Sequence, residues 1–265
     1  MASKKPQPQP EIVESPTKQF NTKRMIGVTS DKGGNGKSTV SRMIADLALQ
    51  KEIPTLAFDC DKRNAQLYRY YNQAFASAIN SGAGVSRLDL SAKGGADKLI
   101  NSLESESTRI VLIDFPAGGG ELFERFEKDI KLFDLLEEIG YELTMVSVLS
   151  RVKDSINSLR TLIDYCGDRA NHVVVKNGFF GEPEKFRRFD NSKTKDLILE
   201  KNGIVINFPD LYDDTYDLLD DKDMRFSDAL KPESGLMLAD RRRVKVFLDE
   251  AEAELLKAAQ FLGLV

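Results

Sequence analysis

The sequence predicts an α/β protein in which one doubly wound, mainly parallel sheet carries helices on both faces. Apolar runs rich in β-branched residues alternate with helix-period runs from end to end. The run Ile110–Asp114 has no polar alternation, as expected of a strand buried on both faces. A glycine-rich turn joins the first apolar run to the first helical run. With 265 residues, 41% of them hydrophobic, the chain can bury one full core.

The predicted elements follow one another without an internal repeat. Residues 25–29 form the first strand and residues 40–48 the first helix. Further strands are predicted at Pro54–Asp59, Val85–Leu90, Ile110–Asp114, Leu143–Leu149, His172–Lys176 and Gly203–Asn207. Further helices are predicted near 65–71, 122–139, 153–165, 192–200 and 240–262. Ligands on parallel sheets bind at the carboxyl ends of the strands, so motifs that follow strand ends are the candidates for a site.

The bulk properties exclude several classes of protein. Residues 1–22 hold four of the nine prolines and predict a disordered tail, either dispensable or a docking peptide, before one domain over 23–265. We expect neither a secretory signal nor a membrane span, because no long apolar run exists. Cys60 and Cys166 lack metal-ligand spacing and suit a reducing cytoplasm. His172, the only histidine, is expected to be structural, so a histidine-based triad is not expected.

Residues 31–39, DKGGNGKST, predict a phosphate-binding loop between a strand and a helix. Gly33, Gly34 and Gly36 can adopt positive φ and bring backbone N–H groups to an anion. Lys37 is expected to reach the terminal phosphates, and Ser38 to hold Mg²⁺ through its hydroxyl. The whole segment Gly33–Thr39, Asn35 included, is the predicted nucleotide-binding loop.

Two acidic motifs end predicted strands close to this loop. Asp114 ends the run IVLID and precedes FPAGGG, and a carboxylate there can order the water shell of Mg²⁺. Asp59 ends another strand, and Asp61 follows two residues later. Two carboxylates so close to a polyanion are costly unless a cation or a proton-transfer role offsets them. The alternatives are a solvated acidic turn at 59–61 and a plain flexible turn at 118–120.

The motif KGGNGKST resembles the deviant Walker A motif of the ParA/MinD family of ATPases, with Asp31 where the usual loop has glycine. The resemblance implies that Lys32 reaches the nucleotide of a partner subunit. FDCD and DFPAGG are similar to the family's acidic and switch segments. They imply a magnesium-side role for Asp59, a water-orienting role for Asp61 and a γ-phosphate switch at residues 118–120. The segment 61–71 lacks the DPQG of many plasmid ParA proteins and looks closer to the MipZ branch.

The same resemblance places two residues of the far half beside the base. Asn177, just after a predicted strand, matches the family's adenine-reading asparagine, and Pro209 matches the segment that lines the base. An Asn-Gly turn and a strand-ending proline are equally good interpretations of these two positions.

The expected function is that of a Mg²⁺-dependent ATPase that forms a homodimer across ATP, with Lys32, Lys37 and Asp61 as catalytic residues and Ser38, Asp59 and Asp114 on the metal side. Its cycle would time binding to a surface and to an adaptor protein, in the cytoplasm or on the nucleoid. Two basic clusters could bind nonspecific DNA or simply be solvated: Lys185, Arg187, Arg188, Lys193 and Lys195, and Arg241, Arg242, Arg243 and Lys245.

Alternative functions share the motifs. One is an ATP-dependent metabolic ligase or synthetase on the same fold, and another is a partner-regulated ATPase of conjugation. A membrane-binding final helix is less favoured, because its polar side is acidic and packing on the sheet explains its apolar stripe. The acidic segment 213–223 could dock a basic peptide, but the sequence favours a solvated loop there.

Overall fold

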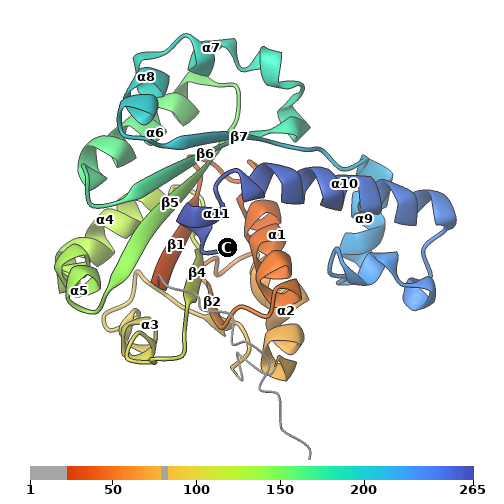
Figure 1. Cartoon of the computed structure of the whole chain (residues 1–265), viewed down its shortest axis with the longest axis horizontal. Helices are drawn as coiled ribbons and strands as arrows, with labels where there is room; N and C mark the ends of the chain where they lie inside the picture. Colours follow the sequence, from red (N-terminus) through yellow and green to blue (C-terminus); the bar gives the residue numbers. More distant parts are fainter. Residues whose placement is uncertain (1–22, 79–82) are drawn as a thin grey trace, which may run out of the picture.

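The computed structural model describes residues 23–78 and 83–265, and within them seven strands form one sheet in the order β3-β2-β4-β1-β5-β6-β7 (Figure 1). All neighbouring strands are parallel. The strands are β1 (Lys23–Thr29), β2 (Thr55–Asp59), β3 (Ser86–Arg87), β4 (Ile110–Asp114), β5 (Tyr141–Leu149), β6 (Asn171–Asn177) and β7 (Ile204–Phe208). The predicted doubly wound sheet is therefore confirmed.

Helices cover both faces of this sheet (Figure 1). The α-helices are α1 (Lys37–Gln50), α2 (Gln66–Ser77), α3 (Asp97–Ser102), α4 (Gly119–Ile130), α5 (Leu132–Glu138), α6 (Lys153–Cys166), α7 (Arg187–Asp190), α8 (Lys193–Glu200), α9 (Asp213–Asp221), α10 (Leu238–Leu256) and α11 (Ala259–Leu262). Short 3₁₀ turns are η1 (Gly178–Phe180), η2 (Pro183–Lys185), η3 (Asp228–Leu230) and η4 (Pro232–Ser234).

The pleat of the strands divides the core between the two faces. In β1, Ile26 and Val28 pack with α1, α2, α10 and α11, whereas Met25 packs on the other face with α3, α4 and α5. A third apolar cluster lies between β6 and the helices α6, α7 and α8. His172 on β6 is buried, as expected of a structural histidine.

Strand order places the phosphate-binding loop at the centre of the sheet. The chain leaves β1 toward β2 on one side, and later continues from β5 to β6 and β7 on the other, so the loop after β1 lies where the direction of winding reverses. In the register of the sheet Asp59 lies opposite Asp114, and Thr29 opposite Ser147. The motifs at 59–61, 114–120 and 177 all follow strands at this same edge.

The predicted helix 122–139 is wrong as a single element. Lys131 has a left-handed φ of 57° and separates α4 from α5. The buried stripe of α4 contains Phe123 and Phe126, and a continuous helix would not bring Leu132 and Leu136 onto that same stripe. The break changes the direction of the chain, so that α5 buries both Leu132 and Leu136.

Three other boundaries differ from the prediction. The segment 213–221 is the helix α9 rather than a loop, because Thr215 and Leu219 form a buried i, i+4 pair. The last predicted helix ends at Leu256, and α11 follows after a short break. The strand expected at 85–90 is only the two residues of β3, while α3 had no predicted counterpart. The tail prediction for residues 1–22 lies outside the described residues.

Candidate nucleotide-binding site

The loop between β1 and α1 has the backbone shape of a phosphate cradle. Gly34 and Gly36 have φ values of 80° and 83°, whereas Gly33 does not adopt positive φ. Gly36 is the N-cap of α1 and no side chain caps this helix, so the first N–H groups of α1 remain for a ligand. A Cβ at position 36 would lie 2.2 Å from Nδ2 of Asn177, so only glycine fits here.

A cavity of about 1310 Å³ opens over this loop at the carboxyl edge of the sheet. The sequence-predicted residues that line it are Gly33, Gly34, Gly36, Lys37, Ser38, Thr39, Asp61, Asn177 and Pro209. Asn35 does not line it, because its side chain turns back and donates to Asp31. Gly118 and Gly120 line the cavity as well, beside Glu121, Glu124 and Arg125 of α4.

Lys37 and Asp61 face each other inside the cavity. The Lys37 Nζ lies 3.5 Å from Oδ2 of Asp61, and the lysine is buried. The other oxygen of Asp61 accepts hydrogen bonds from the N–H groups of Arg63 and Asn64, both at 3.0 Å, which fixes the carboxylate. A cation and a held carboxylate therefore converge over the loop.

Asp59 lies beneath this pair and is buried. Its carboxylate accepts the N–H groups of Asp61 and Tyr68, each at 3.0 Å, so it anchors the turn that carries Asp61 and the start of α2. Burial raises the pKa of Asp59, and the two hydrogen bonds partly oppose that rise. The two acids of the DCD segment thus have different surroundings.

Asp114, at the end of β4, fits a metal-side role. It is completely buried, and Oδ1 accepts the Ser41 hydroxyl at 3.0 Å while Oδ2 has no partner. Burial raises the pKa of Asp114 to about 7, against the attraction of Lys37. Neither Asp59 nor Asp114 reaches the cavity wall, whereas Ser38 does. No cluster of three potential metal ligands exists within the described ranges, so these residues would share Mg²⁺ with phosphate and water.

Lys32 points away from this cavity. Its Nζ lies 2.9 Å from Oδ2 of Asp154 at the start of α6, and both side chains are more than half exposed. Lys32 lines a second, separate cavity of about 600 Å³ together with Arg151, Lys185, Arg187 and Arg188. The structure therefore joins the unusual lysine of the loop to the first basic cluster, a juxtaposition that sequence reasoning missed.

Asn177 and Pro209, which the resemblance placed beside the base, both line the cavity. The amide of Asn177, however, contacts protein at both ends: Nδ2 donates to the Asn35 carbonyl at 2.8 Å, and Oδ1 accepts the Phe179 N–H at 3.1 Å. Asn177 thus ties the phosphate loop to the turn after β6.

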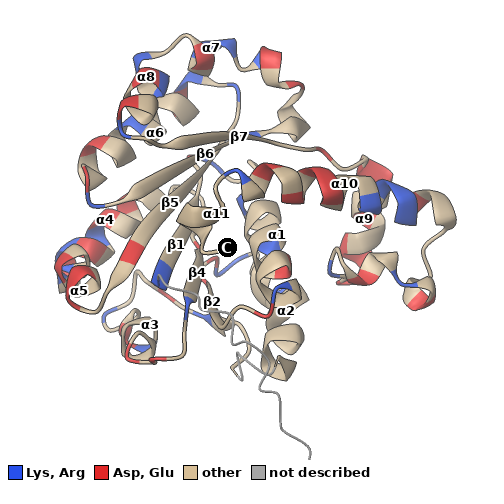
Figure 2. Cartoon of the chain, in the orientation of Figure 1, with Lys and Arg blue, Asp and Glu red and all other residues tan. Residues whose placement is uncertain are grey.

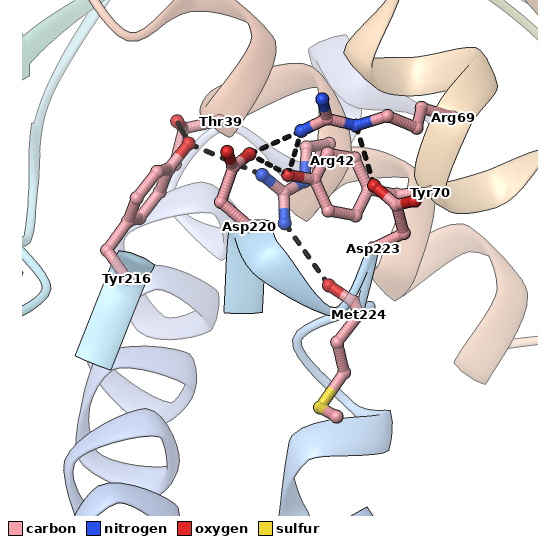
Figure 3. A network of polar contacts seen from close by, with 8 residues as sticks. All are labelled: Thr39, Arg42, Arg69, Tyr70, Tyr216, Asp220, Asp223 and Met224. Atoms are coloured by element: carbon pink, nitrogen blue, oxygen red, sulfur yellow. Dashed lines mark hydrogen bonds and ion pairs between the residues drawn. The ribbon is translucent and has the colours of Figure 1, made fainter. Parts of the chain in front are cut away.

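Sequence reasoning also missed a polar network that links the loop to α9 (Figure 3). Tyr216 of α9 lines the cavity, and its hydroxyl lies 3.3 Å from both the Thr39 hydroxyl and a guanidinium nitrogen of Arg42. Arg42 of α1 is fully buried and stacks on Tyr70, 3.7 Å from the ring centroid. Thr215 and Leu219, the buried residues of α9, are spaced i, i+4, and this spacing was the signal that could have placed Tyr216 on a helix.

No protein-family profile matches the chain. Protein MobD of Acidithiobacillus ferrooxidans is 26% identical over 204 residues, 77% of this chain and 85% of that protein. Protein TraL of Escherichia coli is 26% identical over 233 residues, 83% of this chain and 91% of that protein. Among solved structures, a Borrelia burgdorferi protein described as a plasmid partition protein, bound to AMPPNP, aligns with a TM-score of 0.52 and 14% identity over 89% of this chain and 99% of that one.

The MinD cell division protein of Aquifex aeolicus aligns with a TM-score of 0.48 and 17% identity over 84% of this chain and 97% of that one. The chain has the fold of the Borrelia burgdorferi plasmid partition protein. At these identities the likeness shows the fold alone. None of the helices in the described part of the chain has the length and apolar character that a membrane span requires.

The two basic clusters differ in their surroundings. Arg243 pairs with Asp240 at 2.8 Å and stacks on Tyr212, and Lys245 pairs with Asp249. Figure 2 shows this basic start of α10 beside the acidic α9. In the first cluster Lys195 pairs with Asp190, whereas Lys185, Arg187 and Arg188 have no ion-pair partner among the described residues. The apolar stripe of α10 and α11 is buried in the core, as packing on the sheet predicted.

Proposed function

We propose that the protein is a Mg²⁺-dependent ATPase. One observation carries this proposal: Lys37, Asp61 and the uncapped start of α1 meet around one cavity at the carboxyl edge of the sheet. Phosphoryl transfer depends on positioned charge and a positioned nucleophile more than on covalent help from the protein. The AMPPNP bound to the partition protein with the same fold supports ATP as the nucleotide.

Each side chain has a role in the proposed reaction. Lys37 and the backbone N–H groups of residues 33–39 would bind the phosphates, and Asp61, held by two N–H groups, would orient the attacking water. Mg²⁺ neutralises charge on the phosphate oxygens when it is bound. Ser38, Asp59 and Asp114 would hold it, directly or through its water shell, and the unpartnered oxygen of Asp114 supports that assignment.

The proposal extends to an ATP-dependent homodimer. Lys32 lies outside the nucleotide cavity of its own chain, and its only ion pair among the described residues, with Asp154, is on the exposed surface, where a second subunit could replace it. Each Lys32 would contact the nucleotide of the partner, and a cation supplied in trans accelerates related reactions roughly 10³–10⁵-fold. Hydrolysis would then time binding to nonspecific DNA and to an adaptor protein, for partitioning or positioning of a plasmid, a chromosome or another cargo.

An ATP-dependent ligase or synthetase is the second candidate. The cavity extends past the phosphate loop to Glu121, Glu124 and Arg125 of α4, and this is the room that a small second substrate would need. A conjugation ATPase would use the same site as the first proposal and differ in its cargo.

The experiment that tests the proposal is sizing by light scattering with Mg²⁺ and either ADP or a slowly hydrolysed ATP analogue, with and without nonspecific duplex DNA. We expect dimers only with the analogue, and DNA retention only by those dimers. Lys37→Ala should weaken nucleotide binding, whereas Lys32→Ala should bind nucleotide normally but lose dimer-dependent turnover. Lys128→Ala, which removes another exposed, paired lysine outside the cavity, is the matched control.

Two results would contradict the proposal in different ways. Equal loss of nucleotide affinity in the two lysine variants would remove the trans role of Lys32. If the oligomeric state did not change with nucleotide or DNA, and ATP turnover required a small-molecule substrate, the ligase would be favoured.

A further inference from the structure

Phe179 is an exposed aromatic side chain that lines the same cavity as the phosphate-binding loop. It lies in η1, directly after β6, and lines the cavity together with Asn177 and Pro209. Its residue surface is 57% exposed, although the phenylalanines at 180, 186 and 189 are partly or fully buried in the third apolar cluster. Leaving more than half of an aromatic side chain in water is unfavourable, and a ligand that covered it would remove that cost.

The backbone that carries Phe179 is fixed on two sides. Its N–H is bound by Oδ1 of Asn177, and Nδ2 of that same amide holds the Asn35 carbonyl of the phosphate loop. A Cβ on Gly178 would lie 2.8 Å from the Phe208 carbonyl oxygen and 2.9 Å from the Asp210 nitrogen, so the turn abuts the chain that continues to Pro209. The position of Phe179 is therefore set relative to both the phosphate-binding loop and the segment around Pro209.

The ring itself has one aromatic neighbour. Phe180 contacts it edge to face, with centroids 5.3 Å apart and planes at 83°. The other aromatic residues that line this cavity are Phe208 and Phe247, which are buried, and Tyr216, whose hydroxyl already contacts Thr39 and Arg42. Among the described aromatic residues that line the cavity, Phe179 thus offers a ring surface that protein does not cover.

We propose that Phe179 stacks on the base of the bound nucleotide, and that Asn177 acts as the positioning residue that holds the stacking ring. This inference rests on the proposed function, because it names how that same cavity binds its nucleotide. A planar base matches a fixed, exposed ring beside a phosphate-binding loop, because its flat face can stack on the ring while its phosphates bind the loop. Every base has such a face, so stacking is tolerant of base identity. Phe179 therefore adds affinity for the base, and it does not choose between adenine and guanine.

The test compares ligands with and without a base. Calorimetric titration of the full chain with Mg·ATP, Mg·ADP and Mg·tripolyphosphate should show that Phe179→Ala weakens both nucleotides about tenfold and leaves tripolyphosphate unchanged. The ratio of ATP to GTP affinity should stay as in the unmodified protein. Met237→Ala, which truncates an even more exposed apolar side chain outside the cavity, should change none of these affinities.

The chain contains no tryptophan, so Phe179→Trp introduces a single fluorescent reporter. Its emission should be quenched by ATP and ADP and stay unchanged with tripolyphosphate. Normal ATP affinity in Phe179→Ala, an equal loss for ATP and tripolyphosphate, or emission that ignores ATP would each overturn the stacking role and leave the ATPase proposal intact. An unmodified protein that binds neither ATP nor tripolyphosphate would overturn both.

Discussion

Gly34 and Gly36 have almost the same left-handed backbone angles but different surroundings. Nothing lies within 4 Å of a Cβ at position 34, whereas a Cβ at position 36 meets the amide of Asn177 at 2.2 Å. Gly34→Ala should therefore cost only the left-handed strain, about 1–2 kcal/mol of the free energy of unfolding. Gly36→Ala should cost more and should also weaken nucleotide binding, because Asn177 must move and release the Asn35 carbonyl.

Urea unfolding and nucleotide titration of both variants check this prediction. Adding Asn177→Ala should recover part of the stability that Gly36→Ala loses, while it should not help Gly34→Ala. Equal costs for the two glycine substitutions would show that the contact with Asn177 does not matter.

His172 makes stability depend on pH. It is buried without a hydrogen-bond partner on either ring nitrogen, and burial lowers its pKa to about 4. The unfolded chain has a histidine pKa near 6.5, so between these values the unfolded state binds more protons and stability falls as pH falls. Between pH 7 and pH 5.5 the protonation of this histidine in the unfolded state should lower the free energy of unfolding by about 1 kcal/mol.

The check is urea unfolding of the unmodified protein and His172→Leu at both pH values. The raised pKa values of Asp46 and Asp114 act in the opposite direction, so the difference between the two proteins, rather than either pH profile, isolates the histidine. The prediction would be wrong if the free energy of unfolding changed equally with pH in the unmodified protein and in His172→Leu.

The local residues of the site were predictable, and their distant partners were not. Lys37 and Ser38 follow from one glycine-rich turn between a strand and a helix. The contacts Asn177–Asn35 and Lys32–Asp154 join residues more than 100 positions apart, and no periodicity in the sequence encodes such pairs. The same limit applies to Phe179, whose exposure depends on where η1 lies in the fold.

At the scale of elements, prediction succeeded where the hydrophobic pattern has a single period. It failed where tertiary packing or a high density of charge outweighs that pattern. The buried strand β4 and the amphipathic α6 have a single clear pattern. The break at Lys131 arises because α4 and α5 must bury different stripes, a tertiary demand that overrides local helix propensity. The segment 213–223 contains six aspartates, and this acidic composition predicted a solvated loop. The helix α9 has only two buried residues, Thr215 and Leu219, but they are spaced as a helix requires.

Arg42 joins three helices, α1, α2 and α9, into one unit (Figure 3). Its guanidinium stacks on Tyr70 of α2 and on Phe226, 4.4 Å from that ring centroid, and donates to Tyr216 of α9 and to the Met224 carbonyl. Arg42→Ala removes this packing and should lower the free energy of unfolding by about 3 kcal/mol. Arg42→Met, which keeps the apolar stem, should cost less.

The matched control is Arg160→Ala, which removes an exposed i, i+4 ion pair on α6 and should change stability by at most about 0.5 kcal/mol. Denaturant unfolding monitored by circular dichroism measures all three variants. A cost for Arg42→Ala no larger than that of the control would mean that the network of Figure 3 does not hold the helices together.

At the scale of the whole molecule, strand order explains why separate motifs form one site. The motifs at 31–39, 59–61, 114–120 and 177 are spread over more than half of the chain, and a parallel sheet brings all the strand ends that precede them to one edge. The alternation of strands and helices predicted a mainly parallel sheet, whereas the order of the strands came only from the structure.

Charge is the other property of the whole molecule that bears on function. With a net charge of −4 the chain does not attract DNA as a whole, so DNA binding must come from a local patch of cations free of carboxylates. Arg187 and Arg188 meet that requirement, whereas Arg243 and Lys245 are each paired with an aspartate. The proposed DNA surface should therefore include Arg187 and Arg188 rather than the start of α10.

Double substitutions of the two pairs decide between these surfaces. Arg187→Ala with Arg188→Ala should weaken duplex DNA binding by the ATP-analogue form and reduce the slope of log affinity against log salt by about 2, since each lost phosphate contact removes about 0.9. Arg243→Ala with Lys245→Ala should change the slope by less than half as much, because Asp240 and Asp249 already offset those cations. Fluorescence anisotropy of labelled DNA across a salt series measures both, and the opposite ranking would place the surface on α10, where the acidic α9 would have to move aside for the DNA.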